Sequence, residues 1–507
     1  MHLVEEQSAG VGKRRGGGVA AWRAVAAGVI ASLVALAGCG STYRPVVATI
    51  GLIGPAGQPV KYAVAISSPT QTPGGPITFT GAWSATTTYA INQGVSYLGS
   101  QYVSLQNGNL NHNPVTATAY WSLLTDGLLT MVDFSGDTTL ATTAIGVNPY
   151  YFALGASGSI AYTLNSDDTV TSIQLSIAQI SSQVLETTLL PGAAPVSLFA
   201  SSVSTYMADP GVNAIDQLTG TPAALKQVLP IASSYTPVYV IGQGLTSRLY
   251  AISQATGGGP GQAEAVETST NTISNTIPVG RGPVYGVMTA DNRRAFVLNQ
   301  TDGTVSVINT STNQLDTPVN TIMVGPRPVW ADLASGLDEL VVANEGNGTS
   351  PGSVSIINIP LCTSTTLPTN PNCDASNPVD ATTFGQIVAT VPVGINPIMV
   401  SVLSDYSRAY VANAGVLGLP CAAVAVAGVS TTCTVSVVNL TSNTVTATIP
   451  IQGHPAYIAT SDGTPTGKVY VVCKDSQVMT VIETDTDSLD TTVPLQGYGV
   501  SVRVTAP

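Results

Sequence analysis

The cysteines of this chain have the most evident chemistry, because their spacing suits disulfide formation. Cys362 and Cys373 are eleven positions apart in one loop-like stretch, and Cys421 and Cys433 are twelve apart in another. Each pair can close a local loop, which is typical of proteins that fold in an oxidising compartment. Neither pair has the Cys-x-x-Cys spacing of a zinc or redox site. The sequence therefore predicts two loop disulfides, whereas Cys473, in the apolar run VYVVCKD, is expected to be a small buried residue.

Histidines are too few to support a catalytic or metal centre. Beyond the N-terminal segment only His112 and His454 remain, and His454 precedes a proline where similar segments carry Asn-Pro or Arg-Pro, so a turn role is favoured. Asp485 and Asp487 could suggest calcium, but the similar stretch NTSTNQLD indicates a turn between strands. No glycine-rich phosphate motif opens a helix. We therefore predict no catalytic residues, no metal, no cofactor and a protein that is not an enzyme.

The N-terminus has the pattern of an export signal. Three basic residues at 13–15 precede an apolar stretch, 24–37, that is too short to span a membrane as a mature helix. The stretch ends in Leu-Ala-Gly-Cys39, which resembles the lipobox of bacterial lipoproteins. That resemblance implies removal of residues 1–38, lipidation of Cys39, and a linker over 39–58; an ordinary signal peptide is the alternative. Gly40 favours the outer membrane, so we expect an exported protein anchored to the bacterial cell envelope.

Charge and hydropathy limit the partners. Removal of residues 1–38 leaves 12 Lys and Arg against 26 Asp and Glu, a net charge of about −14. Nucleic acid is therefore not expected as a partner, because phosphate binding needs clustered positive charge. No later apolar run has membrane-spanning length, so the predicted membrane contact is the lipid anchor alone. We expect a monomer.

Repeats of about 45 residues determine the predicted fold. Residues 281–325 read as four short strands separated by turn signals, which matches one blade of a β-propeller. Similar units recur along the chain, and we count eight. The phrases AYVAN, GTVSVIN and TVTATIPIQG resemble the YVTN-type β-propeller repeats of bacterial surface and secreted proteins. The resemblance implies an all-β propeller over 59–507 with seven or eight four-stranded blades, eight being favoured.

Closure of the ring is also predicted. The final GYGVSVRV looks like the opening strand of a further blade, and the first unit lacks such a strand. Pairing of residues 497–504 with the first blade would remove both exposed sheet edges. An open β solenoid is the alternative.

A small β module, residues 78–126, interrupts the first unit. Its two flanking strands end near Ser67 and begin near Gly127, and a hairpin tip tolerates such an insertion. Its residues follow the order W…Y…V-x-Y-x-G-x-x-Y…P…W, from Trp83 to Trp121. This pattern resembles chitin-type carbohydrate-binding modules of families five and twelve. This resemblance and the affinity of sugar rings for aromatic faces imply a carbohydrate site, although the family's usual tryptophan pair is replaced by Leu105-Gln106. The residues concerned are Trp83, Tyr89, Tyr97, Tyr102, Tyr120 and Trp121. They can equally form the core of a spacer or protein-contact module.

Three insertions are expected to share one face. The module, the Gly/Pro-rich ATGGGPGQ (255–262) and the loop 421–433 all fall between the second and third strands of their units, whereas the loop 362–373 falls between the third and fourth. Long loops on one face favour a binding scaffold that recognises polysaccharide or a cell-envelope protein. The alternative function is a propeller hydrolase or lactonase in the periplasm or at the cell surface.

Overall fold

The computed structural model describes residues 61–73, 75–176, 184–244, 246–361, 382–416, 418–421, 433–461 and 467–505. These residues contain strands and turns but no helix, and therefore no helix that could cross a membrane. Residues 59–507 form one compact unit. Cys39, Cys362 and Cys373 lie outside the described residues, so the predicted lipid anchor and one predicted disulfide cannot be placed.

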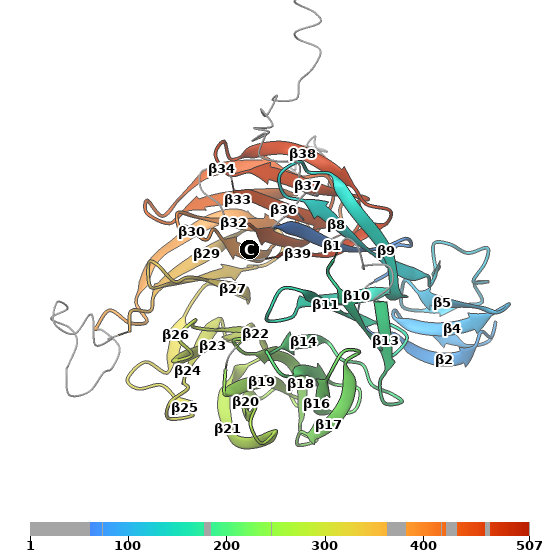
Figure 1. Ribbon diagram of the computed structural model, residues 1–507, viewed down its shortest axis with the longest axis horizontal. Coiled ribbons are helices and arrows are strands. Elements are labelled where there is room, and N and C mark those ends of the chain that lie inside the picture. Colours follow the sequence, from blue (N-terminus) through green and yellow to red (C-terminus); the bar gives the residue numbers. More distant parts are fainter. Residues whose placement is uncertain are drawn as a thin grey trace, which may run out of the picture. The chain divides into compact units, whose positions relative to one another are not determined.

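Eight sheets follow one another along the described chain, seven of four strands and one whose fourth position is shared by two short strands (Figure 1). We number them as blades, with blade 1 in the order β39-β1-β8-β9 and blades 2 to 8 following in sequence. The first strands are β39 (Tyr498–Val504), β10 (Pro149–Leu154), β14 (Ser197–Ala200), β18 (Tyr235–Ile241), β22 (Pro283–Met288), β27 (Pro328–Ala334), β31 (Pro397–Val402) and β35 (Pro455–Thr460). The second strands are β1 (Tyr62–Ser68), β11 (Ile160–Asn165), β15 (Thr205–Asp209), β19 (Arg248–Ala255), β23 (Arg294–Asn299), β28 (Glu339–Asn344), β32 (Arg408–Asn413) and β36 (Lys468–Cys473).

The third and fourth strands complete each blade. The third strands are β8 (Asp126–Asp133), β12 (Thr169–Gln174), β16 (Ala214–Thr219), β20 (Pro260–Glu267), β24 (Thr304–Asn309), β29 (Pro351–Asn358), β33 (Thr434–Asn439) and β37 (Val478–Glu483). The fourth strands are β9 (Thr139–Val147), β13 (Val184–Thr188), β17 (Ala224–Pro230), β21 (Thr272–Arg281), β25 (Gln314–Leu315) with β26 (Thr321–Met323), β30 (Ile387–Ile395), β34 (Thr444–Pro450) and β38 (Ser488–Pro494).

The first strands of the blades contact one another in a closed series, which makes them the inner wall of a propeller. Each touches the first strand of the next blade, and β35 of blade 8 touches β39, which in turn touches β10 of blade 2. The C-terminal strand β39 pairs antiparallel with β1, so the two ends of the propeller lie side by side (Figure 1). This arrangement confirms the predicted all-β propeller class and its closure by C-terminal residues, which leaves neither end of the ring as an open sheet edge.

Burial explains the hydrophobic pattern of the strands. The second strands read as continuous apolar runs such as RAYVAN of β32, and they are buried on both faces because a neighbouring blade packs on each side. The outer strands alternate between exposed and partly buried residues, as in TVTATIP of β34. Apolar side chains thus fill the spaces between adjacent blades, and hydrophobic burial is the main contribution that holds the blades together.

A buried asparagine at the end of the second strand explains one letter of the repeat signature. Asn413 donates from its side-chain amide to the hydroxyls of Thr434 and Ser436 on the third strand, at 3.1 and 3.0 Å. The preceding outer strand contributes Gly394, where an added Cβ would lie 2.6 Å from the Asn413 side chain. The same glycine and asparagine pairs occur in three other blades: Gly146 with Asn165, Gly280 with Asn299, and Gly325 with Asn344. The repeated Gly and Asn therefore encode a close approach between the outer edge of one blade and its successor.

Turn residues explain the acidic stretch near the C-terminus. Asn271, Asn313, Asn443 and Asp487 occupy the same place in the turn between third and fourth strands, all with positive φ, a conformation that Asn and Asp tolerate. The Asp487 carboxylate also accepts hydrogen bonds from Arg408 and the Tyr410 hydroxyl. The interpretation of this stretch as a turn is confirmed.

A second group of strands lies between β1 and β8. It consists of the sheet β2 (Thr78–Ala82), β4 (Gln93–Tyr97), β5 (Ser100–Ser104) and β7 (Trp121–Leu123), with the separate pair β3 (Thr88–Tyr89) and β6 (Asn109–Leu110) (Figure 1). We call residues 78–126 the module. The module connects the second and third strands of blade 1. Residues 421 and 433 likewise lie between the second and third strands of blade 7, β32 and β33. These two connections therefore emerge on the same face of the propeller.

The segment ATGGGPGQ corrects one expectation. It lies between β19 and β20, again between second and third strands, but it forms no long loop. The turn comprises only residues 256–259, because Pro260 and Gly261 already belong to β20. Gly258 supplies the positive φ that this tight turn requires.

Candidate functional site

The aromatic residues of the module divide into a buried core and a partly exposed set. Tyr89 and Trp121 are each 2% exposed, and their rings pack edge to face against each other. Together with Val95 they form the core of the module. The Trp121 indole N–H donates to the His112 carbonyl at 2.8 Å. Both rings therefore belong to the core of the module, as in the alternative that the sequence left open for these aromatic residues.

Four of the predicted sugar-contacting residues remain half-buried. Trp83 and Tyr97 lie edge to face, with ring centroids 5.2 Å apart, and Asn113 donates its side-chain amide to the Tyr97 hydroxyl at 2.9 Å. Tyr120 stacks on the imidazole of His112, and Tyr102 borders the module core. None of these four rings is fully exposed.

A cleft of about 720 Å³ lies where the module meets blade 1. The segment that leads from β1 into the module forms one side, and module side chains together with Tyr498 of β39 form the other. The lining residues are Pro69, Thr70, Gln71, Thr72, Pro73, Ile91, Leu105, Thr118, Trp121, Ser122, Leu123 and Tyr498. This lining combines apolar surface with hydroxyl and amide groups and includes no Asp, Glu, Lys, Arg or His side chain.

A smaller cavity of about 160 Å³ adjoins the cleft at the end of the inner strands. It shares Thr70, Thr72, Pro73 and Tyr498 with the cleft. Its other walls come from the starts of three inner strands and from Lys474. The two hollows therefore share part of their lining at the starts of the inner strands.

Aromatic side chains of the inner strands contact one another, and sequence reasoning missed them. Tyr239, Tyr285, Trp330 and Tyr457 come from four different blades and touch in series, with centroid distances of 4.6, 3.9 and 5.7 Å. Each stands two residues after the proline that opens or enters its inner strand, as in PVY, PVW and PAY. That recurring spacing is the signal that could have identified them.

Two charged groups lie among these rings. The guanidinium of Arg503 lies 3.7 Å from the ring centroid of Tyr457, a cation–π contact. The Asp332 carboxylate accepts hydrogen bonds from the backbone N–H groups of Val402 and Leu333, both at 2.8 Å. Burial raises the pKa of Asp332 to about 6, although these two hydrogen bonds lower it in part. The inner strands thus place a cation, Arg503, and a carboxyl of perturbed acidity, Asp332, beside these rings.

A further perturbed carboxyl lies between blades 2 and 3, far from any predicted site. Asp209 and Asp216 are both fully buried on the same face of the neighbouring strands β15 and β16. Oδ1 of Asp209 accepts the N–H groups of Ala194 and Gly211, each at 2.8 Å. Burial and then the charge of Asp209 raise the pKa of Asp216 to about 7.

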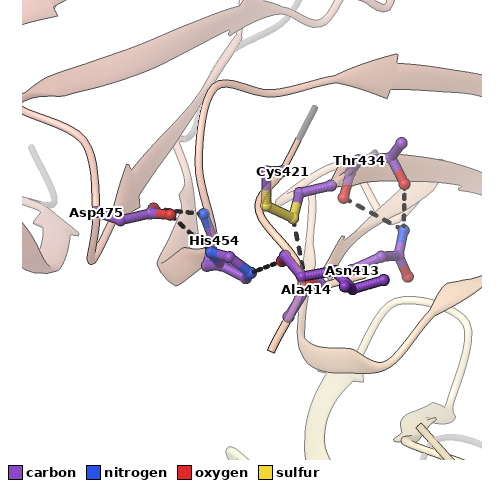
Figure 2. Close-up of a disulfide and its surroundings, with 8 residues drawn as sticks. Asn413, Ala414, Cys421, Thr434, His454 and Asp475 are labelled. Carbon is purple, nitrogen blue, oxygen red and sulfur yellow. Dashed lines mark hydrogen bonds and ion pairs between the residues drawn. A yellow bond between two sulfur atoms is a disulfide. The ribbon is translucent and has the colours of Figure 1, made fainter. Parts of the chain in front are cut away.

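The predicted disulfide between Cys421 and Cys433 is present, and it has an unexpected neighbour (Figure 2). His454, at the start of blade 8, lies beside it, so that one ligand atom from each of the three residues lies within 4.8 Å of the others. The His454 ring is held by Asp475 through Nδ1, at 2.7 Å, and its Nε2 lies 3.0 Å from the Leu419 carbonyl oxygen (Figure 2). Asp475 also accepts the His454 backbone N–H, which fits the predicted turn role. Cys473 is buried, as predicted, with a pKa raised to about 12 chiefly by burial.

Comparison with known proteins supports the fold. No protein-family model matches the chain, and no curated protein matches it in sequence. Among solved structures, the dihydro-heme d1 dehydrogenase NirN in complex with DHE is similar over 73% of this chain and 71% of its own, with a TM-score of 0.52 and 10% identity. Apo AztD from Citrobacter koseri covers 88% of this chain and 98% of its own, with a TM-score of 0.49 and 9% identity. Hydrazine synthase from Kuenenia stuttgartiensis covers 62% and 90%, with a TM-score of 0.45 and 17% identity. At these identities the similarity to NirN shows a β-propeller fold alone.

Proposed function

We propose that this protein is an exported, lipid-anchored β-propeller scaffold that binds neutral polysaccharide in the cleft between its module and blade 1. The observation that carries the proposal is the uncharged lining of that cleft. A sugar ring has apolar C–H faces and a rim of hydroxyls, so it needs apolar surface next to hydroxyl and amide partners. A volume of about 720 Å³ falls within the ~300–1,000 Å³ range of small-molecule sites.

The residues proposed for this role differ from those of the carbohydrate-binding resemblance. Ile91 and Leu123 are 44% and 38% exposed and offer apolar contacts at the cleft. Thr70 and Thr118 offer hydroxyls, although the Thr70 hydroxyl already donates to the Leu123 carbonyl at 2.7 Å. Sugar would then bind in the cleft between the module and blade 1, and the half-buried Trp83 and Tyr97 would not be required.

Export and anchoring rest on the N-terminal sequence. The basic residues, the short apolar stretch and Cys39 support cleavage after residue 38 and lipidation. The lipid would hold the propeller at the envelope, where insoluble polysaccharide is accessible.

Retention on insoluble polysaccharide tests the proposal. The protein without residues 1–39 should be retained by at least one of chitin, cellulose and peptidoglycan. Ile91→Arg, which places a long charged side chain in the cleft, should reduce retention at least tenfold. Leu98→Arg is the matched control, because Leu98 is 80% exposed on the same module and does not line the cleft. Absence of retention by all three materials, or equal loss in both variants, would refute binding at this cleft.

A further inference from the structure

We infer that Cys421, Cys433 and His454 form a redox-gated binding site for a thiophilic divalent cation such as Zn²⁺. The disulfide is the closed state of this site, and reduction would convert it to two thiolates next to a fixed imidazole. This assignment is independent of the polysaccharide cleft, because none of the three residues lines it.

The tertiary structure brings the three ligands together. Cys421 and Cys433 lie in the connection between β32 and β33 of blade 7. His454 lies in the connection between β34 of blade 7 and β35 of blade 8. Their ligand atoms lie within 4.8 Å of one another, close enough for one metal ion after small side-chain rotations. Two sulfurs and one imidazole nitrogen form a ligand set that zinc accepts.

Asp475 orients the imidazole for this role. Its Oδ2 lies 2.7 Å from Nδ1 of His454, and its Oδ1 accepts the His454 backbone N–H at 2.6 Å. Metal-binding histidines commonly have one ring nitrogen on a carboxylate while the other nitrogen holds the metal. Nε2 is therefore the ligand atom, and its present contact is the Leu419 carbonyl oxygen on the side of the disulfide (Figure 2).

Access to the disulfide is one-sided. Cys433 is fully buried, whereas Cys421 is half-buried. A thiolate of a dithiol reductant would attack the Cys421 sulfur, and the Cys433 sulfur would leave as a thiolate. The second thiol of the reductant then releases Cys421, so that the reductant becomes a disulfide and this protein gains two electrons and two protons as two thiols.

Metal binding would follow reduction. A divalent cation binds the two cysteines as thiolates, and their two protons leave to solvent. Three protein ligands leave one coordination position for water or for an exchangeable ligand, which is the arrangement of an open zinc site. Exchange with an oxidised dithiol would restore the disulfide and release the ion, because the two thiolates pass two electrons to the oxidant, which takes up two protons from solvent and becomes a dithiol. The local redox state would thereby decide whether this face of the propeller holds metal.

Cobalt titration tests the site, because Co²⁺ replaces Zn²⁺ and its thiolate complexes absorb light. The experiment uses the full chain with Cys362→Ser and Cys373→Ser, two substitutions that remove the other predicted disulfide. Cys473 is kept in every variant. After reduction with a phosphine, this protein should bind one equivalent of Co²⁺ with a thiolate-to-cobalt charge-transfer band, and Zn²⁺ should displace the cobalt. The oxidised protein should show no such band.

Two single variants separate a metal site from incidental thiols. His454→Asn supplies the residue that precedes Pro397 at the corresponding place in blade 7 and should weaken binding by the reduced protein at least 100-fold. Asp475→Asn should weaken it about 10–100-fold, as loss of an orienting partner does. If the reduced protein gives no charge-transfer band, or His454→Asn binds Co²⁺ as tightly as its parent, the assignment is wrong.

Discussion

Asp216 should make this protein less stable as the pH rises from about 4 to about 7. It is fully buried with Asp209, and neither Asp216 oxygen nor Oδ2 of Asp209 has a hydrogen-bond partner among the described residues. Ala194, Gly211 and Val212 donate backbone N–H groups to Asp209, whereas no group in the described part of the chain donates to Asp216. The proton therefore stays on Asp216, whose pKa is raised to about 7 by burial and by Asp209.

The sign and size of the effect follow from this difference in acidity. In the unfolded chain Asp216 ionises near its ordinary pKa of 3.8, whereas in the folded protein it stays protonated up to about 7. Its contribution to stability is fully present below pH 3.8 and is lost as the pH rises through about 7. At about 1.4 kcal/mol per tenfold change in ionisation constant, the loss is at most about 4 kcal/mol. Relaxation around the pair lowers this limit, so we expect about 2–4 kcal/mol.

Urea unfolding of Asp216→Asn between pH 4.5 and 8 measures this loss. Asparagine mimics the protonated acid, so the free energy of unfolding of the variant relative to the parent should rise by about 1–3 kcal/mol between pH 4.5 and pH 8, since part of the loss already occurs between pH 3.8 and 4.5. Asp302→Asn is a control of opposite sign, because hydrogen bonds from Arg281 lower the pKa of Asp302. That variant should be less stable at pH 8, and the difference should shrink at acidic pH. A difference between Asp216→Asn and the parent that does not change with pH would refute the protonation of Asp216 in the folded protein.

Three further changes test the anchor, the module and the repeat. Cys39→Ser should abolish lipid labelling and release the protein from membranes; unchanged retention would contradict the anchor. Deleting 78–126 and joining β1 to β8 by a short Gly-Ser turn should leave a folded propeller by circular dichroism, since these strands are hairpin neighbours; loss of the β-sheet signal would show that the module is integral to blade 1. Gly394→Ala should cost about 1–3 kcal/mol in thermal unfolding, because the added Cβ meets Asn413, whereas Gly257→Ala has open space and should cost less than about 1 kcal/mol.

The sequence predicted the propeller because its determinants are local and repeated. A strand buried on both faces has a continuous apolar sequence, and the turns between strands carry Asn or Asp at positive φ. Each repeat can therefore be identified from its own sequence of about 45 residues. The missing strand of the first unit and the surplus strand at the C-terminus predicted the pairing of β39 with β1. The disulfide between Cys421 and Cys433 was predictable for the same reason, since both cysteines belong to one connection.

The candidate sites depended on contacts between residues that are distant in sequence. Residue types alone could not decide whether the rings of Trp83 and Trp121 face solvent, and the tertiary structure buries Trp121. The aromatic rings of the inner strands, such as the stacked rings of Tyr285 and Trp330, come into contact because the inner strands of successive blades pack against one another. His454 lies in the connection between β34 and β35, and it comes close to the Cys421 sulfur only once blades 7 and 8 have packed together. Local periodicity therefore determined the strands, whereas packing between blades, which fixes distances across the ring, decided which side chains can act together.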